Sequence, residues 1–261
     1  MKLIIVIMLL SLSQLFPQRT EVRNDLKKFF DEYSHKGCFV LYDLKNDTYI
    51  KYNPKRCAER FIPASTFKIF NSLAALESGV IKDENEIIKW DSVKRFYDMW
   101  NQDLDLTKAY KYSAVWFYQE LARRIGYERM KEFIDSNNYG NKNIQGGIDL
   151  FWLEGELRIS PDEQIEFLKK LYQNKLTFSQ RSIDIVKRIM IYDQTDDYVL
   201  RAKTGWGIIS KNNIGWFVGY VESKNNVYFF ATNLETKHPE EGYSSRIKIT
   251  YNILKYLGII I

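Results

Sequence analysis

Strand-forming segments lie at both ends of this 261-residue chain, and helix-forming segments fill the middle. The strand pattern, apolar and aromatic residues bounded by polar turns, occurs at residues 37–42, 48–52, 198–203, 215–222 and 227–234. Helical spacing of apolar residues occurs at residues 21–33, 68–78, 114–125, 161–171 and 245–256. We therefore predict an α/β fold of the α+β type, in which a central antiparallel sheet is flanked by terminal helices and carries an inserted helical subdomain.

This pattern also predicts how the chain divides. We expect one catalytic domain over residues 20–261, made of a sheet subdomain (20–62 and 198–261) and a helical subdomain (63–197). Ser160 and Pro161 are suited to the N-cap and first position of the helix at 161–171. A cleft between the two subdomains is the natural place for a ligand.

The first 19 residues have the features of a secretory signal. Lys2 precedes an apolar stretch at residues 3–10, and Ser11 and Ser13 supply the small side chains of a cleavage site, which we expect after Ser13. The mature protein is then exported, periplasmic and without a stable membrane partner. A retained N-terminal anchor is the alternative.

Composition excludes several function classes. The formal charge of +5 is spread over mixed charged residues, so no basic stripe for nucleic acid is present. His35 and His238 are the two histidines and form no H-E-x-x-H arrangement, so we expect no metal site. Too few histidines and no G-x-S-x-G elbow also argue against a Ser-His-Asp triad. The sequence does not decide whether Cys38 and Cys57 form a disulfide, and it does not decide the oligomeric state.

A candidate nucleophile stands where an apolar helix begins. In Pro63-Ala64-Ser65-Thr66-Phe67-Lys68, positions i and i+3 bring Lys68 within reach of Ser65. Burial and the helix dipole both favour the neutral, basic form of a lysine at this position. A second S-x-x-K match, Ser245 to Lys248, lies in the C-terminal helix, where a solvated helix face is the better interpretation.

A second motif follows at Lys203-Thr204-Gly205, near the end of a predicted strand and just before Trp206. On a strand beside the serine, Lys203 and Thr204 would bind a substrate carboxylate, and Gly205 would let the substrate approach the backbone.

With these motifs in order, the chain resembles the class D β-lactamases over nearly its whole mature length. Ser65-Thr66-Phe67-Lys68 is similar to their nucleophile motif, and Lys203-Thr204-Gly205 to their K-T-G element. Ser113-Ala114-Val115, Tyr139-Gly140-Asn141 and the segment Phe151-Trp152-Leu153-Glu154-Gly155 match three further family elements. Arg246 lies at the position where the family has an arginine that helps to bind the substrate carboxylate.

The resemblance implies a penicillin-recognising serine enzyme fold and assigns roles. Ser65 would be the nucleophile, and Lys68, carrying a carbamate derived from carbon dioxide, the general base. Ser113 would relay a proton to the β-lactam nitrogen, and Trp152 would donate to the carbamate. Val115 and Leu153 would keep the carbamate pocket apolar.

The expected substrates are small β-lactams of the penicillin type, hydrolysed without metal or organic cofactor, with antibiotic resistance as the result. The backbone N–H groups of Ser65 and Trp206 would hold the carbonyl oxygen during acyl transfer. Two alternatives remain, a penicillin-sensing receptor domain and a cell-wall transpeptidase, each acylated without turnover. Trp90, Trp100 and Trp116 are expected to pack, although they are also candidates to line the cleft.

Overall fold

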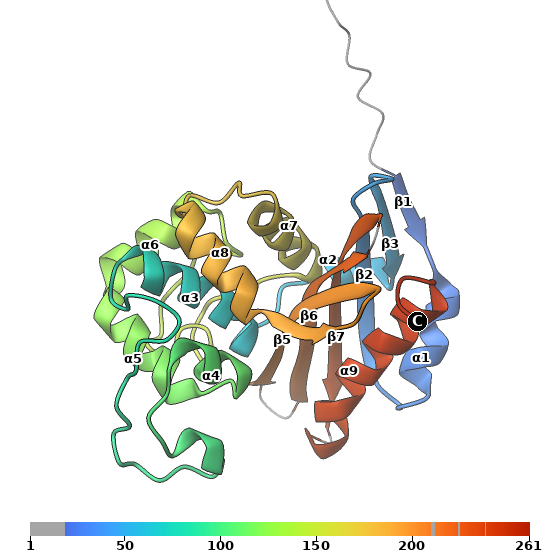
Figure 1. The fold of residues 1–261 in the computed structure, drawn as a ribbon. Coiled ribbons are helices and arrows are strands. Elements are labelled where there is room, and N and C mark those ends of the chain that lie inside the picture. The colour runs from blue at the N-terminus through green and yellow to red at the C-terminus, as the bar shows by residue number, and fades with distance from the viewer. Residues whose placement is uncertain (1–18, 210–211, 224, 238) are drawn as a thin grey trace, which may run out of the picture.

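The structure, a computed structural model, describes residues 19–209, 212–223, 225–237 and 239–261 (Figure 1). The predicted signal segment lies outside these residues except for Arg19, with which the first strand begins. None of the helices that the structure describes is both long enough and apolar enough to span a bilayer.

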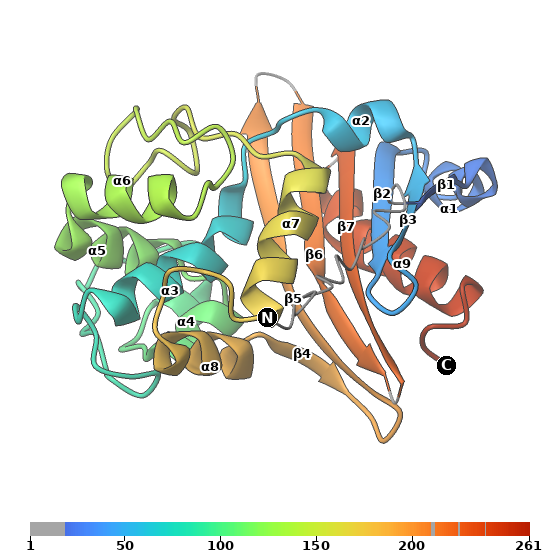
Figure 2. The ribbon, with the colours of Figure 1, turned by 90° about the horizontal axis from the view of Figure 1, so that it is seen from above.

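A seven-stranded sheet forms the centre of the molecule (Figure 2). Its order is β1 (Arg19–Val22), β3 (Thr48–Tyr52), β2 (Lys36–Asp43), β7 (Asn226–Thr236), β6 (Asn212–Ser223), β5 (Tyr198–Ile209) and β4 (Ile191–Gln194). All neighbours are antiparallel except β1 and β3, which pair in parallel. The predicted fold and the two predicted hairpins, β2–β3 and β6–β7, are confirmed.

Helices from the two termini cover one face of this sheet. Helices α1 (Lys27–Asp31) and α9 (Pro239–Tyr256) pack on this face, where Phe30 and Ile253 join a buried cluster with Phe217 of β6. The predicted helix at 21–33 is shorter than expected, because strand β1 and a 3₁₀ turn at Asn24–Leu26 precede α1. The other face is covered by α2 (Pro54–Ala58) and α7 (Pro161–Tyr172) (Figure 2).

The remaining helices form a lobe beside the sheet (Figure 1). They are α3 (Lys68–Glu77), α4 (Leu106–Lys111), α5 (Val115–Ile125), α6 (Tyr127–Ser136) and α8 (Gln180–Ile189). Helix α3 is the centre of the lobe, since every residue from Lys68 to Leu76 is buried. A helix that is buried all round must pack against several neighbours, here α5 and α8 among them.

Three details refine the sequence analysis. Ser160 caps α7 as predicted, and Glu163 completes a capping box. The chain returns to the sheet at β4, so the C-terminal part of the sheet begins at Ile191 rather than at residue 198. Cys38 of β2 and Cys57 of α2 are both fully buried free thiols, and the Cys57 thiol donates to the Tyr52 carbonyl at 3.4 Å.

Candidate active site

The candidate nucleophile lies on a strained turn that leads directly into the most buried helix. A 3₁₀ turn at Ala64–Phe67 continues into α3, which puts Lys68 Nζ 2.7 Å from Ser65 Oγ. Ala64 has a φ of 48°, in the left-handed region, which costs a residue with a Cβ about 1–2 kcal/mol. Bonds to both sides hold this conformation: Ala64 N donates to the Trp152 carbonyl at 3.0 Å, and Thr66 Oγ1 donates to the Pro63 carbonyl at 2.7 Å. The turn presents a half-exposed serine on a rigid support.

Lys68 is a buried amine with few polar neighbours. Its exposed fraction is 0%, and burial lowers the pKa of its amine from 10.5 to about 7. The Tyr118 ring lies 5.3 Å from Nζ, and no carboxylate among the described residues forms an ion pair with it. A large share of Lys68 is therefore neutral near pH 7, as a proton acceptor for Ser65 must be.

Ser113 and Lys203 reach the same place from two other parts of the chain. Ser113 follows α4 with a φ of 55°, and Lys203 Nζ donates to its Oγ at 3.0 Å and to the Thr204 carbonyl at 3.0 Å. Burial holds the pKa of Lys203 well below its usual range, and the charges of Lys68 and Arg246 lower it further. Lys203 therefore lies within electrostatic reach of both Lys68 and Arg246.

Gly205 lets strand β5 lie against the nucleophile turn. A Cβ at this position would be 3.0 Å from Thr66 Cγ2, 3.1 Å from the Pro63 carbonyl oxygen and 3.2 Å from Trp216 Cβ. These contacts are tighter than side chains normally make, so a Cβ at this position would require the strand or the turn to move by a few tenths of an ångström. The sequence analysis assigned Gly205 to substrate approach alone, and the structure adds this packing role.

Arg246 of α9 lies over Trp206, the residue after the K-T-G element. Its guanidinium carbon is 5.3 Å from the Trp206 ring centroid and 5.4 Å from that of Tyr243. Burial lowers its pKa to about 10, and its Nε has no hydrogen-bond partner in the part of the chain that the structure describes. An anion arriving beside Thr204 and Trp206 would meet an arginine with donors to spare.

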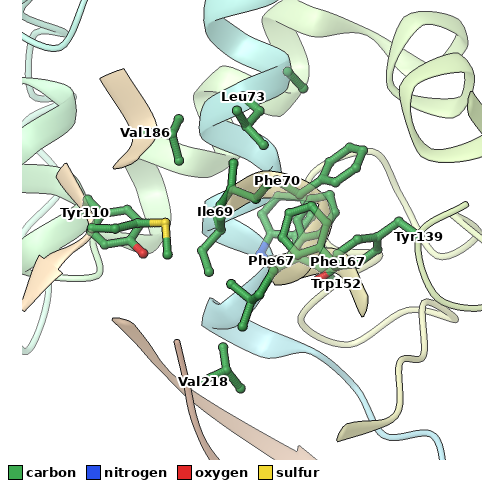
Figure 3. Packing of buried hydrophobic residues seen from close by; sticks show 14 of the residues in the cluster. Phe67, Ile69, Phe70, Leu73, Tyr110, Tyr139, Trp152, Phe167, Val186 and Val218 are labelled. Carbon is green, nitrogen blue, oxygen red and sulfur yellow. The ribbon is translucent and has the colours of Figure 1, made fainter. Parts of the chain in front are cut away.

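Trp152 lies against the other side of the nucleophile turn (Figure 3). It is fully buried, and its ring stacks on Phe67 at a centroid distance of 5.4 Å. Its indole N–H is buried without an acceptor among the described residues. Because buried indole N–H groups normally have a partner, this one suggests that an acceptor belongs at the site. Val115 and Leu153 are half-buried.

Other motif residues have structural roles. Tyr139 is buried against Phe67 and Phe70, and Gly140 has a φ of 53° in a turn whose Asn141 bonds the Glu156 carbonyl (Figure 3). This agrees with the expectation that the segment is a turn.

The second S-x-x-K match is not a site. Ser245 is buried and bonded to His35 at 2.8 Å, whereas Lys248 is exposed. The expectation of a solvated helix face therefore holds for Lys248 and is wrong for Ser245. The tryptophans pack as expected: Trp116 donates to the Trp100 carbonyl at 2.8 Å, and Trp100 to the Tyr112 carbonyl at 2.9 Å.

Sequence reasoning missed one buried pair behind the nucleophile. Gln164 of α7 donates through Nε2 to Thr66 Oγ1 at 2.9 Å, and both residues are fully buried. The pair ties the nucleophile turn to a helix on the sheet. A usable signal was present, since Gln164 falls among Pro161, Ile165 and Leu168 on the apolar face of α7.

Comparisons with known proteins identify the family of this chain. The family model described as "Penicillin binding protein transpeptidase domain" matches residues 37–255. Beta-lactamase OXA-48 of Klebsiella pneumoniae is 46% identical over 88% of this chain and 87% of its own length. A class D β-lactamase structure from Nostoc is 48% identical and superposes with a TM-score of 0.88, covering 91% of this chain and 100% of that one. The C-terminal domain of the Bacillus licheniformis BlaR penicillin receptor is 38% identical with a TM-score of 0.90, covering 95% and 100%.

Proposed function

This chain belongs to the class D β-lactamase family of serine hydrolases, and from that premise we propose that it hydrolyses penicillin-like antibiotics through an acyl-enzyme on Ser65. The observation that carries the proposal is the 2.7 Å contact between Ser65 Oγ and the buried Nζ of Lys68. A serine hydroxyl becomes a nucleophile only when a base takes its proton, and a lysine with a pKa of about 7 is suited to that task.

The acyl transfer uses groups that converge on Ser65. Its Oγ attacks the ring carbonyl carbon, and the carbonyl oxygen gains negative charge. The backbone N–H groups of Ser65 and Trp206 would stabilise that charge, since the Ser65 amide is in the first turn of a helix, where N–H groups lack an intrahelical acceptor.

Cleavage of the bond between the carbonyl carbon and the ring nitrogen requires a proton on that nitrogen. Ser113 Oγ would relay it: its own proton passes to the nitrogen, and a proton returns to Oγ from Lys203 Nζ, which donates to it at 3.0 Å. The substrate carboxylate would bind to Lys203, Thr204 and Arg246, because these residues supply donors and positive charge beside the nucleophile. That carboxylate would favour the charged form of Lys203.

Lys68 is proposed to carry a carbamate derived from carbon dioxide. The residues fit this group: the amine is substantially neutral, as reaction with carbon dioxide demands, and the Trp152 N–H is a buried donor without an acceptor. A carbamate would supply a carboxylate-like base for both acylation and the later activation of water. Without a hydrogen-bond donor such an anion is not tolerated in a buried pocket, and Trp152 and Ser65 are the candidate donors.

Export and resistance are part of the proposal. The segment with Lys2, the apolar residues 3–10 and the small residues Ser11 and Ser13 supports secretion, and a periplasmic enzyme would destroy penicillins before they reach their targets. No metal ion, organic cofactor or nucleic acid has a role in the proposed reaction.

Steady-state turnover tests the proposal against the receptor-like alternative, which is raised by the 38% identity to the BlaR domain. The purified mature protein should hydrolyse many equivalents of nitrocefin or benzylpenicillin. A single-equivalent burst that then stops would instead identify a receptor or a transpeptidase. Ser65→Ala should remain folded and give no penicillin adduct by intact mass; an adduct on that variant would show that another residue is the nucleophile.

A further inference from the structure

His35 joins the first long strand of the sheet to the helix that carries Arg246. It directly precedes β2, and its backbone N–H donates to the Phe30 carbonyl of α1 at 3.1 Å. Its side chain is buried, and Nε2 shares a hydrogen bond of 2.8 Å with Ser245 Oγ of α9. Helices α1 and α9 lie side by side on this face of the sheet (Figure 1). The bond therefore ties α9 to the junction between α1 and β2.

Ser245 lies directly before Arg246 in α9, and both side chains are buried. Gly242 and Arg246 share the helix face that contacts Trp206: a Cβ on Gly242 would overlap the Trp206 ring, and the Arg246 guanidinium carbon lies 5.3 Å from its centroid. Consecutive residues of an α-helix are about 100° apart around its axis, so Ser245 points to one side of that face. The bond to His35 thus holds α9 from the side, one residue from the arginine.

A second bond holds α9 just after Arg246. Thr250 Oγ1 donates to the Arg246 carbonyl at 2.7 Å and is itself bonded to Thr232 Oγ1 of β7. Both threonines are fully buried. With one bond before Arg246 and one after it, the rotation of α9 about its own axis is fixed where the arginine leaves the helix.

Small rotations of α9 would move the guanidinium far enough to affect a bound anion. The tip of a helical side chain lies about 5–6 Å from the axis, so a rotation of about 10° displaces it by about 1 Å. A displacement of about 1 Å can change a rate by about 100-fold. Without His35, the Ser245 hydroxyl would bond back to the carbonyl four residues earlier, and bonds of that kind bend helices.

Packing alone does not account for a polar pair at this place. The face of the sheet that α9 covers is largely apolar, with Phe30, Ile249 and Ile253 in one buried cluster. Apolar side chains tolerate small shifts against one another, whereas a buried hydrogen bond fixes the distance and direction between two atoms. The pair of His35 and Ser245 is therefore suited to set an orientation.

We propose that His35 is a positioning residue for recognition of the substrate carboxylate, because its bond to Ser245 sets the rotation of α9 that places Arg246 over Trp206. The inference rests on the proposed function, which assigns the carboxylate to Arg246. Removing the bond should weaken recognition of the carboxylate and leave the attack of Ser65 on the ring carbonyl nearly unchanged.

Benzylpenicillin and its methyl ester are the probes, because they differ only in the carboxylate. The readout is the acid-to-ester ratio of the second-order rate constants for acylation of Ser65. In a hydrolase this rate constant is measured as kcat/KM, and in a receptor it is measured by intact mass. A general loosening of the fold slows both compounds and leaves the ratio unchanged.

His35→Phe, which keeps an aromatic ring, and Ser245→Ala should each lower the ratio by about tenfold. The double variant should be no lower than either single variant, because both changes remove the same bond. In an Arg246→Ala background, His35→Phe should not change the ratio further. Ile253→Val is the control, since it loosens the buried packing of α9 without removing a hydrogen bond, and its ratio should stay within about twofold of the wild type.

The outcomes separate the positioning role from the proposed function. A ratio that is unchanged in either single variant, or lowered equally in Ile253→Val, would overturn the role of His35. If Arg246→Ala lowers the ratio in that case, the proposed function stands and only this inference fails. If Arg246→Ala leaves the ratio unchanged, the carboxylate role of Arg246 and the positioning role of His35 both fail. Selective loss in His35→Phe and Ser245→Ala supports the inference even if the acyl-enzyme is never hydrolysed.

Discussion

Replacing Lys68 with methionine should stabilise the fold while abolishing activity, because the lysine is buried at a large cost. Its exposed fraction is 0%, and its pKa falls from 10.5 to about 7 through burial. Methionine has a similar length, carries no charge and fits an apolar environment. The only side-chain hydrogen bond lost among the described residues is the one to Ser65.

The size of the expected stabilisation follows from the pKa of Lys68 in the folded chain and in the unfolded chain. Between pH 7 and 10.5 the unfolded chain keeps the Lys68 proton and the folded chain has released it, so the stability of the wild type rises with pH across this window. The difference of about 3.5 pH units, at about 1.4 kcal/mol each, makes the cost ~5 kcal/mol below pH 7. At pH 9 only about 1.5 pH units remain before 10.5, and the cost is ~2 kcal/mol.

Urea unfolding at pH 7 and pH 9, in buffer free of carbon dioxide, measures this difference. Lys68→Met should be more stable than the wild type at pH 7, and its advantage should shrink by about 2–3 kcal/mol at pH 9. Lys255→Met, at an exposed position of α9, is the control and should show no such change. An advantage that is equal at the two pH values, or a variant less stable than the wild type at pH 7, would refute the account of Lys68 as a desolvated amine.

Three further predictions concern the site and the leader. Trp152→Phe keeps the stacking on Phe67 but removes the indole donor, and should need about 10- to 100-fold more bicarbonate for half-maximal turnover, the scale of one hydrogen bond to a charged group. Gly205→Ala should slow acylation at least about tenfold, because its Cβ pushes β5 away from the nucleophile turn; unchanged acylation by intact mass would contradict this. N-terminal sequencing of secreted protein should start at Gln14, and recovery of intact Met1 in membranes would favour the anchored alternative.

Much of the site could be predicted from the sequence because most of its residues belong to short motifs that occur in a fixed order. Helix geometry alone brings Ser65 and Lys68 together. Lys203 lies 135 positions after Lys68, and a strand beside the helix was the simplest way to bring the two motifs together. The long strands were also predictable, since β2 and β7 are almost continuous apolar runs that the structure buries on both faces of the sheet.

The rest depended on tertiary contacts that local patterns do not encode. Strands β1 and β4 have only four residues each and are largely exposed, so they lack an apolar pattern and exist because a neighbouring strand pairs with them. The left-handed backbone of Ala64 is imposed by its bond to Trp152, 88 positions later. Arg246 was found by position alone, and its stacking on Trp206 became visible only once α9 was placed on the sheet.

The central claim, that a carbamate on Lys68 is the base, is tested most directly by one measurement: carbon NMR of the enzyme with ¹³C-labelled bicarbonate, alongside penicillin turnover. The account predicts a carbamate resonance in the wild type that is absent from Lys68→Ala, and that disappears in mildly acidic, degassed buffer together with activity. Both should return when bicarbonate is added at neutral pH. Turnover that ignores bicarbonate after thorough degassing, with no such resonance, would contradict the account and leave Lys68 acting as a free amine.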